Sequence, residues 1–217
     1  MKIFLDTAHA PTVEKKSFLI DGLTTNPTNL AHEGGNPLVT IKKLCALLPD
    51  KDISVEITEI EPQAALKQAR LIAQIAPTIV VKIPCHEPYL PIIKQLIQEK
   101  IRVNITLLFT LAQGLFMAKM GAYYISPFIG RWADAGLPNT HLLAQLRTMI
   151  DRYSYTTKLL AASLRDVSHL QDAIEAGADI ATIPIELLDK IFNHPLTIEG
   201  INKFDTDWQK LKNHRFP

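Results

Sequence analysis

Cysteine is scarce in this chain, and its scarcity excludes one class of small secreted protein. The 217 residues contain 2 cysteines, Cys45 and Cys85, which cannot form a disulfide framework and suit a reducing environment. Cys85 is followed by His86, but two adjacent residues fall short of the ligand set that a metal site requires. We therefore expect no metal ion and no structural disulfides.

The chain also lacks an excess of charge and any long apolar run. Its formal net charge is +1, from 23 Lys and Arg against 22 Asp and Glu, so nothing indicates attraction to nucleic acid or to a membrane surface. No apolar run approaches the ~20 residues that a membrane span needs. Residues 1–6 lead straight into a strand and lack the apolar stretch of a signal peptide. Together these absences predict a cytoplasmic protein.

What the sequence does have is a regular alternation of short β-branched runs and amphipathic segments. A chain of this length can form one domain with a sizeable core. The pattern predicts eight strands, at residues 2–6, 22–25, 53–58, 78–84, 102–109, 123–126, 158–162 and 179–183. Strands that alternate with helices in this way are typical of a (β/α)₈ TIM barrel. A doubly wound open sheet is the competing architecture, but no Gly-rich phosphate loop follows the first strand.

Helices are expected between these strands and after the last one. They are expected at 10–19, at 37–48, from Pro62, around 92–97, at 110–119, 139–152 and 166–176, from Pro184 and at about 195–212. The last helix carries an apolar stripe of Ile198, Ile201, Phe204, Trp208 and Leu211 at helical spacing. We expect a single barrel domain over residues 1–217 with this extra C-terminal helix, whose stripe packs either on its own barrel or on a neighbouring copy.

The stretch Thr78–Pro84 places one lysine inside a continuous run of β-branched residues. Such a run predicts a strand buried on both faces, where lysine is rarely found. Burial favours an uncharged amine, and only a neutral amine attacks a carbonyl. The alternative is that Lys82 ends the strand and extends its ammonium group into water.

Polar residues at the ends of most strands favour a buried, reactive amine at Lys82, because the carboxyl ends of barrel strands form the active site. They are Asp6, Thr25, Asn26, Glu56, Lys82, Asn104, Thr106, Ser126, Ser163 and Arg165. Each alone is compatible with a solvated loop. Taken together, they would be a costly set of buried polar groups without a common purpose.

A lysine surrounded by these groups predicts covalent carbonyl chemistry. Lys82 would form an imine with a ketone, while Glu56 and Thr106 hold a catalytic water. Asp6 is the candidate base that removes a hydroxyl proton so that the neighbouring C–C bond breaks. Asn26, Asn104 and Ser126 would bind the hydroxyls of the donor.

Two arginines follow late strands, Arg131 after Ser126 and Arg165 after Ser163. Arginine matches phosphate with paired hydrogen bonds, and the loops after late barrel strands often bind phosphate. We therefore predict that both bind a substrate phosphate, against the alternative of two solvated surface arginines.

At these residues the sequence resembles the transaldolase family, in particular the short branch that includes the fructose-6-phosphate aldolases. The resemblance runs the whole length and rests on FLDTA at 4–8, TTNP at 24–27, VE at 55–56, VKIP at 81–84, NITLLF at 104–109, SPFIGR at 126–131 and AASLR at 161–165. The chain departs from the usual family residues at His9, Thr28, Thr110 and Trp132.

The resemblance implies a (β/α)₈ barrel with a Schiff-base lysine at Lys82 and transfer of a dihydroxyacetone unit between sugar phosphates, without metal or organic cofactor. The substrates would be sedoheptulose 7-phosphate or fructose 6-phosphate with glyceraldehyde 3-phosphate or erythrose 4-phosphate, in the pentose phosphate pathway. The same acid–base, water-holding, substrate-binding and phosphate-binding roles are implied for the residues above, with Phe128 and Ser163 lining the site. Short relatives also imply a homo-oligomer, a pentamer or decamer in which the C-terminal helix reaches a neighbour.

Two residues favour a transaldolase over a fructose-6-phosphate aldolase. The aldolases carry Gln at the position of Glu56 and Tyr at that of Phe128. A ring without a hydroxyl cannot orient a water, so the enamine on Lys82 should survive until an acceptor arrives. The aldolase activity remains the first alternative. A phosphate-binding barrel isomerase without a covalent step and a catalytically inactive binding or assembly protein are more distant ones.

Overall fold

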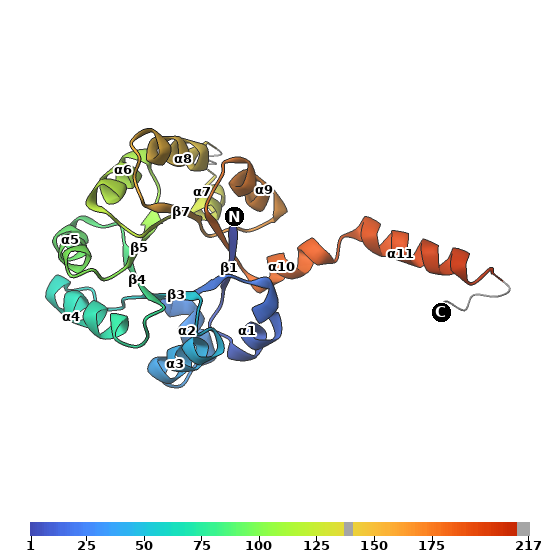
Figure 1. Ribbon diagram of the computed structural model, residues 1–217, viewed down its shortest axis with the longest axis horizontal. Helices are drawn as coiled ribbons and strands as arrows, with labels where there is room; N and C mark the ends of the chain where they lie inside the picture. Colours follow the sequence, from blue (N-terminus) through green and yellow to red (C-terminus); the bar gives the residue numbers. More distant parts are fainter. Residues whose placement is uncertain (137–140, 212–217) are drawn as a thin grey trace.

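A closed barrel of eight parallel strands forms the centre of the computed structural model, which describes residues 1–136 and 141–211 (Figure 1). Each strand pairs with the next in chain order, and β8 pairs with β1. The strands are β1 (Lys2–Asp6), β2 (Gly22–Thr24), β3 (Asp52–Glu56), β4 (Ile79–Pro84), β5 (Val103–Leu108), β6 (Tyr124–Pro127), β7 (Lys158–Ala161) and β8 (Ile180–Ile183). The predicted TIM barrel is therefore confirmed, with strand ends that differ from those expected by at most two residues.

Helices surround the barrel, and one extends away from it. They are α1 (Ala10–Lys16), α2 (Pro27–Glu33), α3 (Pro37–Leu47), α4 (Pro62–Ala73), α5 (Leu90–Gln98), α6 (Leu111–Met120), α7 (Ile129–Asp134), α8 (Leu142–Arg152), α9 (Val167–Glu175), α10 (Ile185–Phe192) and α11 (Pro195–Trp208), with short 3₁₀ turns at Ser17–Leu19 and Glu87–Tyr89. None of the helices in the described part of the chain is long and apolar enough to cross a membrane.

The structure corrects the sequence expectations at three helices. The helix expected over 10–19 ends at Lys16 and continues as a 3₁₀ turn. Two short helices, α2 and α7, were not expected, because seven and six residues are too few to show an apolar period. Proline at the start of α2 and its Asn26 cap are the local signals that were present. Residues 139, 140 and 212, at the expected ends of two helices, lie outside the described residues.

The barrel interior is layered, and this layering positions the site. Phe4, Val80 and Tyr124 belong to a buried apolar cluster inside the barrel. Each lies two residues before a polar residue of its own strand, so the next inward-facing positions are Asp6, Lys82 and Ser126. An apolar layer thus lies below a polar layer at the carboxyl ends of the strands.

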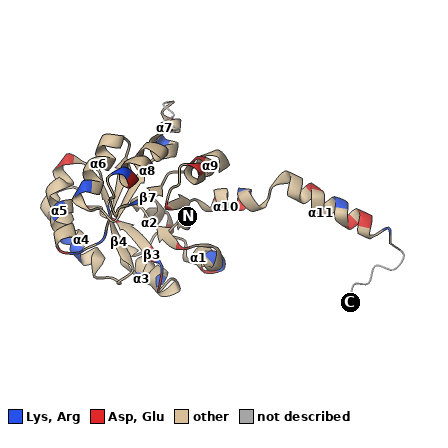
Figure 2. Cartoon of the chain, turned by 45° about the horizontal axis from the view of Figure 1, so that its top comes forward, with Lys and Arg blue, Asp and Glu red and all other residues tan. Residues whose placement is uncertain are grey.

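Charges of both signs occur on the outer helices and along α11 (Figure 2). This distribution agrees with the formal net charge of +1. Among the described residues, these elements carry no large patch of one charge sign, so none of them is marked as an electrostatic docking surface.

The C-terminal helix α11 points away from the barrel (Figure 1), and none of its residues is buried. Within its apolar stripe, Ile201 and Phe204 are 61% and 73% exposed. The apolar stripe therefore does not pack on its own barrel.

Every copy of the chain presents the same projecting helix and the same barrel surface, so a head-to-tail ring would cover all the helices at once. We propose that α11 packs on a neighbouring copy in a homo-oligomer.

We predict that light scattering at micromolar concentration gives the mass of a pentamer or decamer. Phe204→Glu places a charge in the stripe and should shift the protein to smaller species. Thr206→Glu adds the same charge about half a turn away on α11 and serves as the matched control. A monomeric wild-type chain would rule out the assembly.

Candidate active site

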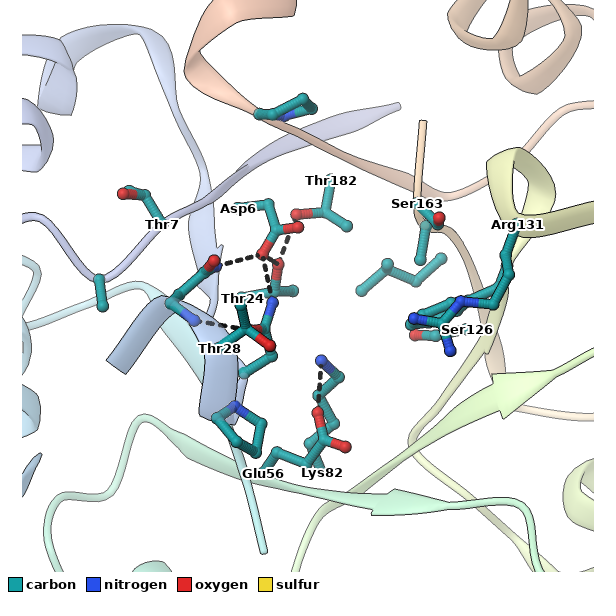
Figure 3. A pocket seen from close by; sticks show the side chains of 18 of the residues that line it. Asp6, Thr7, Thr24, Thr28, Glu56, Lys82, Ser126, Arg131, Ser163 and Thr182 are labelled. Carbon is teal, nitrogen blue, oxygen red and sulfur yellow. Dashed lines mark hydrogen bonds and ion pairs between the residues drawn. The ribbon is translucent and has the colours of Figure 1, made fainter. Parts of the chain in front are cut away.

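A pocket of about 590 Å³ opens at the carboxyl ends of the strands, within the usual size range of small-molecule sites. Ten of the eleven site residues predicted from the sequence line it, namely Asp6, Asn26, Glu56, Lys82, Asn104, Ser126, Phe128, Arg131, Ser163 and Arg165. In Figure 3 Asp6, Thr24 and Thr182 lie on one side, Ser126, Ser163 and Arg131 lie on the other, and Lys82 reaches between them. The eleventh, Thr106, does not line the pocket.

Lys82 is the only charged side chain among the buried residues of the described chain, at 5% exposure. Its Nζ lies 2.9 Å from Glu56 Oε2 and donates to the Thr25 carbonyl oxygen at 3.1 Å. The parallel register of β3 and β4 sets Glu56 directly beside Lys82. The strands themselves therefore bring the amine and the carboxylate together, and the carboxylate offsets part of the cost of burying the ammonium group.

Asp6 occupies a hydrogen-bonded niche at the end of β1. Its Oδ1 accepts from Asn29 Nδ2 at 3.0 Å and from Thr24 Oγ1 at 3.3 Å, and Asn26 Nδ2 lies 3.5 Å away. Thr24 is in turn 2.6 Å from the Thr182 hydroxyl. Burial raises the pKa of the Asp6 carboxyl, and the nearby Lys82 charge and these hydrogen bonds oppose that rise. A carboxyl whose pKa is raised in this way has the character of a general base.

A buried polar chain follows Lys82 around the barrel. Asn104 is the β5 neighbour of Lys82 in register. Its Nδ2 donates to Ser54 Oγ at 3.0 Å, and its Oδ1 accepts from Ser126 Oγ at 2.6 Å. The hydrogen bonds fix the Asn104 amide and the Ser126 hydroxyl in position at the pocket wall.

Thr106 lies two residues further along the same strand and is fully buried. Its hydroxyl makes no hydrogen bond to the described residues. Buried hydroxyls nearly always have a partner, so this group is available to one that the described residues do not supply.

The cationic side of the pocket is built by close packing of α7 against the loop after β7. Gly130 N donates to the Ser163 carbonyl oxygen at 2.9 Å, and a Cβ on Gly130 would lie 2.0 Å from that oxygen. Ser163 itself adopts a left-handed conformation, with φ of 61°. Glycine at position 130 is thus required for Arg131 and Arg165 to lie at the same side of the pocket.

An aromatic cluster supports this side. The Arg131 guanidinium lies 5.3 Å from the centre of the Phe128 ring, a cation–π distance. Phe109 contacts both Phe128 and Trp132 edge to face. Trp132 Nε1 donates to the Phe109 carbonyl oxygen at 3.1 Å. Trp132, one of the departures from the family's usual residues, therefore anchors α7 to the residue that follows β5.

Several pocket residues were missed by the sequence analysis. Thr182 had a signal, a polar residue inside an otherwise apolar strand, and so did Thr24. Asn29 had none, because it lies on the unexpected helix α2. Thr7, Thr28, His32, Glu33 and Glu186 also line the pocket. Among the described residues no group of three or more His, Cys, Asp or Glu side chains is arranged to hold a metal ion.

Known proteins resemble this chain over almost its whole length. A family model described as "Transaldolase/Fructose-6-phosphate aldolase" matches residues 3–215. A "Probable transaldolase 2" of Listeria monocytogenes is 44% identical over 211 residues, which cover 96% of both chains. A "Probable transaldolase" of Dehalococcoides mccartyi is 42% identical over 98% of this chain and 100% of its own. One of Methanococcus maripaludis is 39% identical with the same coverage.

The barrel, the buried lysine and a family match that spans the strands carrying the site agree with one another. The chain belongs to the transaldolase/fructose-6-phosphate aldolase family.

Proposed function

We propose that this protein is a transaldolase that carries a dihydroxyacetone unit on Lys82, from fructose 6-phosphate or sedoheptulose 7-phosphate to erythrose 4-phosphate or glyceraldehyde 3-phosphate, as in the pentose phosphate pathway. The observation that carries the proposal is the buried Lys82 amine beside Glu56 in a pocket shared with Asp6. A buried amine next to a proton acceptor is the arrangement that imine formation needs.

The first step joins Lys82 to the ketone carbon of the donor. Glu56 takes a proton from the ammonium group, and the neutral amine adds to the carbonyl to give a carbinolamine. Protonation of its hydroxyl lets water leave and forms the imine. The unpartnered Thr106 hydroxyl supports a role in holding that water together with Glu56.

The second step breaks the C3–C4 bond of the ketose phosphate. Asp6 accepts the proton of the C4 hydroxyl, the C3–C4 electron pair moves toward the imine nitrogen, and the aldose phosphate leaves. The hydrogen bonds from Asn29 and Thr24 fix the Asp6 carboxylate for this proton transfer. Lys82 is left carrying an enamine, which attacks the carbonyl carbon of the incoming aldose phosphate when the steps reverse.

Binding and orientation come from the other side of the pocket. Arg131 and Arg165 bind the substrate phosphate, and Ser163 lies beside them. Asn26, Asn104 and Ser126 bind the small hydroxyls of the donor. The phosphate then lies on the cationic side while the reacting carbons lie between Lys82 and Asp6.

Transfer is favoured over simple cleavage by the groups near the enamine. A lyase must protonate the enamine with a positioned water, and Phe128 has no hydroxyl to position one. The Phe128 ring instead contacts the Phe109 ring in a T-shaped arrangement and has the Arg131 guanidinium over it. The enamine therefore awaits an acceptor.

We predict that fructose 6-phosphate disappears much faster with erythrose 4-phosphate than without it, giving sedoheptulose 7-phosphate and glyceraldehyde 3-phosphate. Phe128→Tyr should raise cleavage without acceptor relative to transfer, because a phenol can orient water. Coupled assays of both reactions measure the ratio. Equal wild-type rates with and without acceptor would assign the protein to the aldolases instead.

We predict that replacing Arg131 or Arg165 with Ala lowers kcat/KM for fructose 6-phosphate, because a charge-assisted phosphate contact is lost. The loss corresponds to about 2–4 kcal/mol of transition-state stabilisation. With dihydroxyacetone and unphosphorylated glyceraldehyde the loss should be much smaller. Arg70→Ala is the matched control, since Arg70 pairs with Glu99 outside the pocket. Equal losses with both substrate pairs would make the two arginines structural.

A further inference from the structure

The Arg165 guanidinium already has an anionic partner within the chain. Its Nη2 donates to Asp134 Oδ2 at 2.8 Å, and its Nε donates to the same oxygen at 3.2 Å. The Nε–Nη2 edge of arginine is one of the two edges that form paired hydrogen bonds with phosphate. Asp134 thus occupies a position on Arg165 that a phosphate oxygen would take.

The course of the Arg165 side chain explains the contact. A Cβ on Gly130 would lie 2.6 Å from Arg165 Cγ and 3.2 Å from its Nε, so the stem crosses α7 at Gly130. Asp134 lies four residues later and therefore on the same face of that helix. Helix α7 holds Arg131 as well, so one short helix carries a phosphate-binding cation and the anion that engages the second cation.

Asp134 is ionised throughout the neutral pH range. The hydrogen bond and charge of Arg165 lower the pKa of the Asp134 carboxyl, and Arg131 and His169 add smaller effects in the same direction. The carboxylate, in contact with Arg165, therefore reduces the positive potential that a phosphate meets at this arginine.

We propose that Asp134 is a specificity-determining residue that competes with the substrate phosphate for Arg165 and so weakens phosphate binding. The inference rests on the proposed function, because it takes Arg165 as a phosphate ligand. A transferase must release one sugar phosphate before it binds the next, and an internal competitor for the arginine favours that exchange.

The exposure of the pair makes such an exchange feasible. The Arg165 and Asp134 side chains are 49% and 53% exposed, and ion pairs this open to water contribute little to stability. A phosphate dianion brings more charge and more acceptor oxygens than one carboxylate. It can therefore displace Asp134 from Arg165 without a large cost to the fold.

The test is a calorimetric titration of the full chain with inorganic phosphate, which needs no chemistry at Lys82. Asp134→Asn removes the charge and keeps the shape, and we expect the Kd for phosphate to fall by roughly three- to tenfold at low salt. The gain should shrink as salt is raised, because the repulsion that it relieves is screened. Asp134→Glu keeps the charge and should restore wild-type affinity.

A matched control is present at the other end of the barrel. Asp151 Oδ1 and Oδ2 accept from Nη2 and Nε of Arg147 on α8, and neither residue lines the pocket. Arg147 also pairs with Asp179, so it keeps an anionic partner when Asp151 is changed. Asp151→Asn removes the same charge from an arginine pair outside the pocket, and its phosphate titration should match that of wild type. Arg165→Ala calibrates the site and should weaken phosphate binding.

In kinetic assays Asp134→Asn should lower KM for fructose 6-phosphate and raise its kcat/KM relative to dihydroxyacetone. Unchanged or weaker phosphate binding by Asp134→Asn, in a chain that still transfers dihydroxyacetone units, overturns the role of Asp134 alone. Phosphate that binds Arg165→Ala as tightly as wild type overturns the phosphate site itself, and the inference with it.

Discussion

The ion pair between Lys82 and Glu56 is the interaction on which the rest of the site depends. The ammonium group of a lysine that is only 5% exposed is costly inside a barrel, and the adjacent strand supplies the carboxylate that offsets part of this cost. The pairing follows from the register of β3 and β4, so the strand pairing that builds the barrel also places the two groups side by side. The same carboxylate is the group that our proposal uses to free the amine.

Around this pair the pocket is divided by charge according to strand order. Glu56, Asp6 and Glu186 belong to β3, β1 and the start of α10, whereas Arg131 and Arg165 follow β6 and β7. Strands β8 and β1 adjoin in the closed barrel, so the acidic groups gather on one arc and the arginines on another. The division suits a substrate with a phosphate at one end and reacting hydroxyls at the other. Beside the two arginines, our account makes Asp134 the residue that competes with the phosphate for Arg165 and so weakens phosphate binding.

Strand positions and most of the pocket were predictable because inward-facing positions recur every second residue along a strand. Asp6 follows Phe4 and Lys82 follows Val80 by this rule. The environment of each group was not predictable. Asn29 reaches Asp6 from a seven-residue helix too short to show a period, and Asp134 reaches Arg165 only because Gly130 allows α7 to approach the β7 loop. Such contacts depend on packing between segments distant in the sequence. The exposed face of α11 could not be told from a core-facing stripe, because both have the same spacing.

The central claim is that Lys82 forms a covalent imine with the donor. The most direct measurement is reduction with borohydride in the presence of fructose 6-phosphate, followed by mass spectrometry of the peptides. The account predicts a stable dihydroxyacetone-derived adduct on Lys82 and none after substitution of Lys82 by Met. An adduct on another lysine, or no adduct in a preparation that turns over substrate, would contradict it and would favour a barrel enzyme that works without a covalent step.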